Sequence, residues 1–322
     1  MAVYTDLGSE DLARLIAAWD VGTVVSAKGI AEGVSNSNWL IETSGGTHGA
    51  RFILTMYERR IDLGDLPFFL GLLDHLAAAG LPVPRTIHDR EGAAFRMVDG
   101  KAVALIEFLP GVSPTTPSPA QAFATGAVLA RLHAEGADYD QSRANDLSPP
   151  QCAALMQRFS PDALRTIDPD MAPIPGAAQD LAERWPTDLP RSVIHSDLFP
   201  DNVLMLGDEV SGLIDFYFSC NDFAAYDLAV THAAWSFDKG GDVFHEAVGR
   251  AIVEGYESVR PLAPAERAAM PLLAKGACLR FVASRTEDWF DTPPGALVTR
   301  KDPMAFVRRW RFYEKQGSAL FA

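Results

Sequence analysis

The sequence predicts an α+β protein of two lobes, a small antiparallel β-sheet lobe followed by a larger, mainly α-helical lobe. Strand-like runs dominate residues 1–109, whereas helical periodicity dominates residues 110–322. A proline-rich segment, residues 111–119, separates the two patterns and marks the expected boundary. The length of 322 residues also favours two domains.

The amino-terminal lobe is expected to begin with a helix and to continue as a series of strands. Ser9 and the acidic residues after it are typical of a helix start, and the apolar face of this helix would run to Trp19. A second helix over residues 65–79 would end at Gly80. The runs that predict strands are residues 23–27, 39–43, 52–57, 93–98 and 102–109.

A glycine-rich turn, residues 28–38, joins the first two of these strands. Glycines and small hydroxyl or amide residues at such a turn can fold over phosphates and donate backbone N–H groups to them. Ordinary hairpin turns use the same residue types, so the turn alone allows both interpretations. The candidates for nucleotide binding in this turn are Gly29, Gly33, Ser35, Asn36 and Ser37.

The carboxyl-terminal lobe is expected to consist mainly of helices. A helix over residues 119–134 follows Ser118 as its N-cap, and prolines break residues 149–186 into helical pieces. A hairpin-like pattern covers residues 203–214. Further helices are predicted at residues 224–235, 243–256 and 264–290.

Composition and charge narrow the class of protein. The 42 acidic and 28 basic residues give a net charge of −14, which argues against a general nucleic-acid or anionic-membrane surface. The three cysteines lie far apart and form no metal-ligand pattern, which favours a reduced intracellular protein. The amino terminus shows no signal peptide, and no apolar run is long enough for a membrane span. We therefore expect a cytoplasmic protein that binds neither nucleic acid nor membranes.

Three polar residues in an otherwise apolar stretch indicate the chemistry. Asn202 follows Asp197 within one loop, and Asp215 ends the hairpin-like run, which would return it to the same end. Phosphoryl transfer needs one group to orient and deprotonate a hydroxyl, and others to hold Mg²⁺ on the nucleotide phosphates. Asp197 suits the first task, and Asn202 and Asp215 suit the second.

These residues lie in motifs that resemble a known family. His195–Asn202 resembles the catalytic loop of the protein-kinase-like fold, and Ile214-Asp215-Phe216 resembles its metal-binding motif. With the two expected lobes, the chain is similar to the aminoglycoside phosphotransferase superfamily of small-molecule kinases. Longer blocks, which extend the likeness over nearly the whole chain, resemble the bacterial homoserine kinases of that superfamily: residues 29–38, 65–69, 197–202 and 212–229.

The resemblance implies a reaction and a set of roles. ATP would phosphorylate the hydroxyl of L-homoserine to give O-phospho-L-homoserine, a step of threonine biosynthesis. Asp197 would be the catalytic base, and Asn202 and Asp215 would bind Mg²⁺. Glu107 and Leu109 fall where such kinases present backbone groups to adenine.

Two positions depart from the family pattern. Thr55 stands where such kinases carry a strand lysine, so another cation would have to contact the phosphates. Lys28, Arg59 and Arg60 are candidates. Phe199 stands where protein kinases carry a lysine two residues after the base, which argues for a small alcohol as substrate.

Several questions stay open at the level of sequence. Arg280 and Arg285, with Asp201, Asn221 and Asp222, are candidates for contacts to a zwitterionic substrate, and Asp227 matches a helix acid that braces the catalytic loop. Another small-molecule kinase, acting on an aminoglycoside, choline or a methylthio-sugar, is the alternative function. A nucleotide-binding protein without turnover is a third interpretation, which the missing lysine motivates. The oligomeric state is left open.

Overall fold

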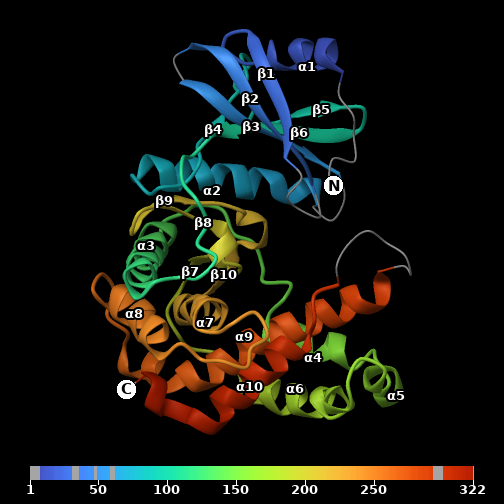
Figure 1. Ribbon diagram of the computed structural model, residues 1–322, viewed down its shortest axis with the longest axis vertical. Coiled ribbons are helices and arrows are strands. Elements are labelled where there is room, and N and C mark those ends of the chain that lie inside the picture. The colour runs from blue at the N-terminus through green and yellow to red at the C-terminus, as the bar shows by residue number, and fades with distance from the viewer. Residues whose placement is uncertain (1–7, 31–35, 47–48, 59–61, 293–299, 322) are drawn as a thin grey trace. The chain divides into compact units, whose positions relative to one another are not determined.

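The computed structural model describes residues 8–30, 36–46, 49–58, 62–292 and 300–321 and divides into two compact units (Figure 1). The first unit joins Met1–Gly111 to Ser211–Tyr217, and the second joins Val112–Val210 to Phe218–Ala322. The first unit therefore includes a segment from much later in the chain. An antiparallel sheet in the first unit and helices in the second confirm the predicted α+β class.

The first unit is a six-stranded antiparallel sheet with one helix packed on each face. The strand order is β1-β2-β3-β6-β4, and β5 also pairs with β6. Its elements are α1 (Ser9–Ile16), β1 (Val24–Ile30), β2 (Asn36–Gly46), β3 (Gly49–Tyr57), α2 (Leu66–Ala78), β4 (Thr86–Ile87), β5 (Arg96–Val98) and β6 (Lys101–Glu107).

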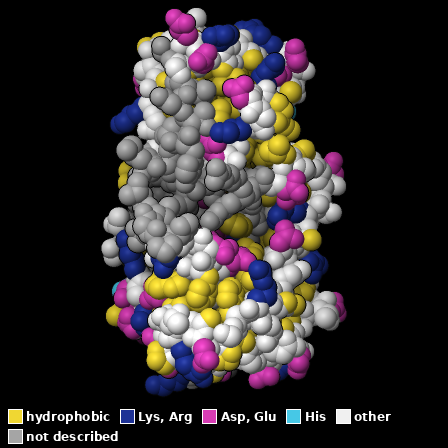
Figure 2. Space-filling model, turned by 90° about the vertical axis from the view of Figure 1, so that its right-hand side faces the viewer, with side chains coloured by type: hydrophobic (Ala, Val, Ile, Leu, Met, Phe, Trp, Pro, Cys, Tyr) yellow, Lys and Arg dark blue, Asp and Glu magenta, His cyan; other side chains and the backbone are white. Residues whose placement is uncertain are grey.

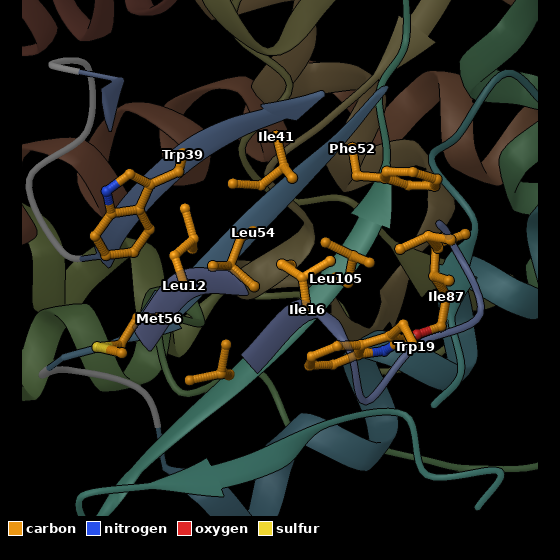
Figure 3. Packing of buried hydrophobic residues seen from close by; sticks show 12 residues of the cluster. Leu12, Ile16, Trp19, Trp39, Ile41, Phe52, Leu54, Met56, Ile87 and Leu105 are labelled. Atoms are coloured by element: carbon orange, nitrogen blue, oxygen red, sulfur yellow. The ribbon is translucent and has the colours of Figure 1, made fainter. Parts of the chain in front are cut away.

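Alternation along β3 and β6 divides the apolar side chains of the first unit into two layers. Successive side chains of a strand point to opposite faces of the sheet. Leu54 and Leu105 therefore pack toward α1, where Trp19 closes the layer by donating from Nε1 to the carbonyl of Ile87 at 2.7 Å (Figure 3). Ala104 lies in the opposite layer, against α2. The sheet is thus covered on both faces.

The second unit is built around α7, every residue of which is buried. α7 packs against α9, while α3 packs along α8. The elements that follow the first unit are α3 (Pro119–Gly136), α4 (Pro149–Met156), α5 (Pro161–Arg165), α6 (Ile174–Glu183), β7 (Arg191–Ile194), β8 (Val203–Leu206), β9 (Glu209–Leu213), β10 (Cys220–Phe223), α7 (Ala224–Trp235), α8 (Glu246–Glu257), α9 (Pro264–Asp291) and α10 (Met304–Gln316).

α3 and α8 approach so closely that their contact requires glycine. A Cβ atom on Gly126 would lie 2.1 Å from the carbonyl oxygen of Ile252, and one on Gly255 would lie 2.0 Å from that of Phe123. Real Cβ atoms do not come this close to backbone atoms. The two glycines therefore set the spacing of these helices.

Two short sheets bound the segment that contains the candidate catalytic residues. β7 pairs with β10 in antiparallel register, with Ile194 opposite Cys220, and β8 pairs with β9. The segment 195–202 runs between β7 and β8, so both of its ends are held in ladders. β9 then carries the chain from the second unit into the first.

Most helices match the sequence-based predictions, with borders that differ by a few residues. The helix expected at residues 224–235 is α7, and the proline-broken region 149–186 contains α4, α5 and α6. The strand predicted over residues 93–98 was too long, because only Arg96–Val98 pairs with β6. Neither α10 nor β10 was predicted from the sequence.

The surface seen in Figure 2 carries acidic and basic side chains interspersed. The net charge of −14 is therefore not gathered into one region on this face. Of the helices in the described ranges, none has both the length and the apolar character that crossing a bilayer would require.

Candidate active site

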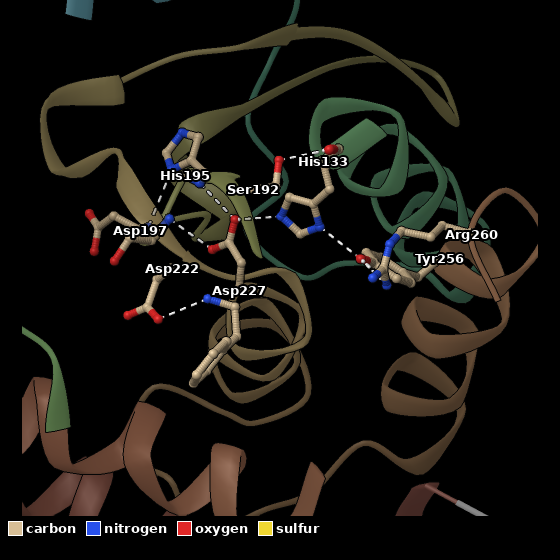
Figure 4. Close-up of polar contacts among 10 residues, drawn as sticks. His133, Ser192, His195, Asp197, Asp222, Asp227, Tyr256 and Arg260 are labelled. Carbon is tan, nitrogen blue, oxygen red and sulfur yellow. Dashed lines mark hydrogen bonds and ion pairs between the residues drawn. The ribbon is translucent and has the colours of Figure 1, made fainter. Parts of the chain in front are cut away.

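A buried carboxylate holds the backbone at the start of the loop between β7 and β8. Asp227 of α7 accepts hydrogen bonds from the backbone N–H of His195 at 2.7 Å and of Ser196 at 2.8 Å (Figure 4). Ser196 has a φ of 65°, a conformation that costs free energy in a non-glycine residue. The hydrogen bonds from the loop offset that cost and fix the direction of the chain at Asp197.

Asp227 is itself held by a chain of donors that reaches to α8 and α9. His133 Nε2 donates to Asp227 at 3.0 Å, and the hydroxyl of Tyr256 lies 2.7 Å from Nδ1 of His133. Arg260 donates to the hydroxyl of Tyr256 at 3.2 Å and to Glu266 at 2.8 Å. A neutral His133 protonated on Nε2 satisfies every one of these contacts. Figure 4 shows this chain running from Arg260 through His133 to Asp227.

The buried Asp227 remains ionised because of these contacts. Burial by itself would raise the pKa of Asp227. The hydrogen bonds that Asp227 accepts from His133 and from the backbone N–H of His195 outweigh that effect and hold the pKa of Asp227 below its ordinary value. Asp227 therefore acts as a permanent brace of the loop, as the resemblance implied.

The carboxylate of Asp197 is oriented by donors on both of its oxygens. Arg280 of α9 donates from Nη1 to Oδ1 at 3.1 Å, and Asn202 donates from Nδ2 to the backbone carbonyl of Asp197 at 2.8 Å and to Oδ2 at 3.4 Å. The side chain of Asp197 is 18% exposed, whereas that of Arg280 is 2% exposed. Asp197 is thus held in one orientation yet remains accessible to a ligand.

Aromatic side chains fix the middle of the same loop. Trp235 of α7 donates from Nε1 to the carbonyl of Leu198 at 2.9 Å. The ring of Phe199 packs edge-on against Phe281 of α9, with 4.9 Å between ring centroids. These contacts leave the loop with few ways to move, which suits a site that works by positioning.

Asn202 and Asp215, the two predicted metal ligands, belong to different units. Asn202 in the second unit directs Nδ2 to Asp197, so its Oδ1 is the atom left for a cation. Asp215 in the first unit has a φ of 67° and lies near the paired hydroxyls of Tyr57 and Tyr217, which are 3.0 Å apart. Burial, with the charge of Asp215, raises the pKa of Tyr217 to about 12.

The donor chemistry of these two residues fits Mg²⁺. Amide and carboxylate oxygens are hard ligands, and Mg²⁺ is commonly held by one or two carboxylates together with substrate phosphates. Within the described ranges, no group of three or more His, Cys, Asp or Glu side chains could hold a metal ion by itself.

Three of the five candidate nucleotide-binding residues of the glycine turn, Gly29, Asn36 and Ser37, lie in β1 or β2. Gly29 pairs with Trp39 in the β1–β2 ladder, and Asn36 and Ser37 begin β2 as buried residues. Asn36 Oδ1 is buried without a hydrogen-bond partner among the described residues, so it remains available to a donor. Gly33 and Ser35 lie outside the described residues.

Glu107 and Leu109 lie at the carboxyl end of β6 and just beyond it. The N–H of Glu107 donates to the carbonyl of Arg85 at 2.9 Å, and its side chain accepts two hydrogen bonds from the guanidinium of Arg85. Within the described part of the chain, the backbone N–H of Leu109 donates to no backbone or side-chain group. Leu109 can therefore still offer that N–H to a ligand.

The comparison with protein families decides the class. A family model described as the phosphotransferase enzyme family matches residues 26–262. The chain belongs to this phosphotransferase family. The catalytic class that the motifs predicted is therefore confirmed.

Curated relatives of this phosphotransferase share nearly half of its residues. A homoserine kinase of Nitrobacter winogradskyi is 47% identical over 98% of this chain and 96% of its own length. A homoserine kinase of Rhizobium etli is 46% identical over 99% of this chain and 98% of its own length. The resemblance to homoserine kinases that the motifs suggested is confirmed over nearly the full length.

Solved structures show the same fold at much lower identity. An amicoumacin kinase in complex with AMP-PNP superposes with a TM-score of 0.71 at 14% identity, covering 97% of this chain and 95% of its own. A spectinomycin phosphotransferase reaches a TM-score of 0.67 at 14% identity, covering 98% of both chains. The likeness at this identity concerns the fold alone, and it confirms the predicted protein-kinase-like architecture.

In this phosphotransferase, Thr55 stands where related kinases carry a strand lysine, and its side chain makes a polar contact. Thr55 of β3 donates to Asn38 Oδ1 at 2.9 Å. Lys101, which was not among the predicted candidates, begins β6 and forms an ion pair with Glu58. The carboxylate of Glu58 also accepts a hydrogen bond from Ser37 at 2.8 Å. A lysine and an acid thus meet the start of β2, beside the glycine turn. No sequence signal indicated this, because the pair spans two strands.

The sequence predicted three other cation candidates for the phosphates, Lys28, Arg59 and Arg60. Lys28 is exposed on β1, and Arg59 and Arg60 lie outside the described residues. Lys101 contacts the glycine turn indirectly, because Glu58 pairs with Lys101 and also accepts a hydrogen bond from Ser37.

Asn221 and Asp222, two candidates for the substrate ammonium, are engaged in the scaffold of the second unit. Asn221 Oδ1 accepts from the N–H of Arg143 at 2.8 Å. Asp222, 4% exposed, accepts from Asn145 Nδ2 at 2.7 Å. Both side chains hold β10 to the loop that contains Arg143 and Asn145. Asp201, a third candidate, is exposed.

Proposed function

We propose that this phosphotransferase transfers the γ-phosphoryl group of ATP to the hydroxyl of L-homoserine and produces O-phospho-L-homoserine for threonine biosynthesis. The observation that carries the proposal is the 46–47% identity to homoserine kinases over nearly the whole length of both chains. The geometry around Asp197 supports the same reaction type, because one accessible carboxylate is held rigidly in the catalytic loop.

The residues of the site would divide the work as follows. Asp197 would align the substrate hydroxyl and accept its proton, and Arg280 and Asn202 would keep its carboxylate in place. Asn202 and Asp215 would hold Mg²⁺, which when bound offsets charge on the phosphates.

The first unit would supply the nucleotide contacts. Leu109 would donate its backbone N–H to adenine, and Glu107 would offer its backbone carbonyl. Lys101 would place a positive charge near the phosphates beside Asn36 and Ser37. The proposed nucleotide-binding lobe, residues 1–109, and catalytic lobe, residues 110–322, correspond to this division of labour.

Small alcohols are the expected acceptors. A protein kinase uses a lysine two residues after its base, whereas Phe199 occupies this position and packs into the second unit. A cytoplasmic location is part of the proposal, because ATP is the donor and the three cysteines are buried as free thiols.

A substrate panel tests the proposal. ADP release would be measured by a coupled assay with L-homoserine, an aminoglycoside, choline and a methylthio-sugar, each with Mg-ATP. We expect turnover of L-homoserine to exceed that of the other alcohols in kcat/KM. An aminoglycoside turned over in place of L-homoserine would contradict the proposal, and the net charge of −14 would then favour such a polycation.

A further inference from the structure

Three arginines of α9 and α10 stack on a pair of phenylalanine rings in the second unit. We call Arg280, Arg285 and Arg309 the arginine cluster. The guanidinium carbon of Arg280 lies 4.4 Å from the ring centroid of Phe281, and those of Arg285 and Arg309 lie 4.6 and 4.2 Å from that of Phe306. The two rings are themselves 4.6 Å apart, so the three charges share one aromatic platform.

This platform packs directly against the catalytic loop. Phe199 lies 4.9 Å from Phe281 and 6.2 Å from Phe306 between ring centroids. Because Phe199 comes two residues after Asp197, the arginine cluster borders the segment that presents the base. Arg280 contacts that base, and the charge of Asp197 also acts on Arg285.

Two members of the arginine cluster lack a direct ion pair among the described residues. Arg280 forms an ion pair with Asp197, but among the described residues Arg285 and Arg309 form none. Arg285 donates to the backbone carbonyl of Asp302 at 2.9 Å, and Arg309 donates to that of Asp238 at 2.8 Å. Cations that are largely removed from water and make no direct ionic contact are costly, so a carboxylate in contact with them would be stabilising.

The pKa values of Arg285 and Arg309 show the cost of removing these cations from water. Burial, reinforced by the neighbouring charge of Arg309, lowers the pKa of Arg285 to about 10 despite the opposing charges of Asp302 and Asp197. Burial also lowers the pKa of Arg309. A bound carboxylate would counter both effects.

Of the three arginines, Arg285 is the one that can reach a ligand. Arg280 is 2% exposed and already engaged with Asp197. Arg309 is 4% exposed, and its Nε and Nη1 are buried without partners in the described part of the chain. Arg285 is half-buried and uses one donor on Asp302, which leaves N–H groups of its fork for a carboxylate.

We propose that Arg285 binds the carboxylate of an amino-acid substrate whose hydroxyl lies at Asp197, with Arg309 adding positive potential behind it. The inference rests on the proposed function, which makes that substrate a hydroxy amino acid. In this proposal Arg280 orients the carboxylate of Asp197, and Arg285 binds the carboxylate of the substrate. The sequence alone could not tell these two roles apart.

The test compares two alcohols that differ in the carboxylate. L-Homoserine and 3-amino-1-propanol share the hydroxyl, the three-carbon spacing to the ammonium and the ammonium itself, but the second has no carboxylate. We expect Arg285→Met to lower kcat/KM for L-homoserine by about 30-fold or more, chiefly through KM, which is the scale for losing one partner of a desolvated ionic contact. For 3-amino-1-propanol and for ATP, kcat/KM should stay within about twofold. Arg285→Lys should fall between, because it keeps the charge but loses the fork.

Arg311→Met is the matched control. Arg311 lies on α10 and forms an exposed ion pair with Asp170 at 2.7 Å, so its loss should leave both alcohols unaffected. Equal losses for both alcohols in Arg285→Met would show a merely structural role and overturn the inference, as would an unchanged KM for L-homoserine. If the wild type turns over L-homoserine, such a result counts against Arg285 alone. A wild type that prefers a carboxylate-free alcohol would overturn both the proposed substrate and this role.

Discussion

Asp197 is the residue on which the proposed chemistry depends, and its neighbours explain why it can act. Arg280 and Asn202 reach its two oxygens from different elements, one from α9 and one from the end of the same loop. A carboxylate fixed at both oxygens loses little orientational freedom when a substrate hydroxyl arrives. In a reaction whose catalysis is mostly positioning, that order matters more than strong basicity.

Removing this carboxylate should abolish most turnover while leaving the nucleotide in place. We expect Asp197→Ala to lower kcat at least ~100-fold, the usual scale for losing an acid–base group. The KM for Mg-ATP should change little, because the proposed adenine and phosphate contacts come from other residues. Steady-state kinetics with L-homoserine measure both values.

Asp208→Ala is a suitable control for that variant. Asp208 is an exposed acid in the turn between β8 and β9 and contacts Ser118 at 3.4 Å. Its variant should retain wild-type kcat. Normal turnover in Asp197→Ala would show that the base has been assigned to the wrong residue.

At the scale of elements, the contact between α3 and α8 supports the catalytic loop from behind. His133 projects from α3 and Tyr256 from α8, and their contact at 2.7 Å requires the helices to keep their spacing. Gly126 and Gly255 permit that spacing, because each lies against a backbone carbonyl of the other helix. Packing of two helices thus determines the position of a side chain that braces the site.

A methyl group at this contact should cost stability. We expect Gly126→Ala to lower the free energy of unfolding by about 1–3 kcal/mol, because its Cβ would overlap the carbonyl of Ile252 and force the helices apart. Urea denaturation monitored by far-UV circular dichroism gives the value.

Gly176→Ala separates packing from helix propensity. Gly176 lies in α6 with nothing near the position of a Cβ, so alanine there should stabilise by about 0.5–1 kcal/mol. If Gly126→Ala were as stable as Gly176→Ala, the close approach of α3 and α8 would not limit stability.

For the whole molecule, one buried histidine gives stability a dependence on pH. His232 of α7 is 1% exposed, its Nδ1 lies 2.6 Å from the hydroxyl of Tyr313, and burial lowers its pKa to about 3. In the unfolded chain its pKa would be about 6.5. The unfolded state therefore binds the proton first as pH falls, and stability is lost progressively below about pH 6.5.

His232→Gln should weaken this dependence. Between pH 7 and pH 5 the wild type should lose about 2 kcal/mol more free energy of unfolding than the variant, from 1.4 kcal/mol for each pH unit below the unfolded pKa. Glutamine keeps an acceptor for Tyr313. Urea titrations at the two pH values measure the difference, and parallel losses in both proteins would mean that His232 is not the group responsible.

The parts of the molecule that the sequence predicted are those with local signals. The catalytic loop was recognised because Asp197, Asn202 and Asp215 lie within one short stretch, and α7 because its pattern is uninterrupted. α10 was missed because arginines interrupt its apolar face, although stacking on Phe306 lets Arg309 be buried there. Charged residues that bury themselves on aromatic rings give no periodic signal.

The parts of the site that the sequence could not supply depend on contacts across long separations. No local signal marks His133 as part of the site, since its partners Asp227 and Tyr256 come roughly a hundred residues later. Lys101 meets Glu58 only because β3 and β6 pair. Arg280 and Arg285 lie close together on α9, and only the structure shows which of them contacts Asp197.

The donor chain from Arg260 to Asp227 has a consequence for the order in which the enzyme matures during synthesis. The catalytic loop is translated before its brace at Asp227, and well before Tyr256 and Arg260, which complete the chain. At ribosomal rates of about 5–20 residues per second, roughly 3–13 s separate Asp197 from Arg260. A nascent chain stalled within that interval would carry the catalytic motif but not the contacts that shape it. Activity should therefore emerge late, when α8 docks on α3.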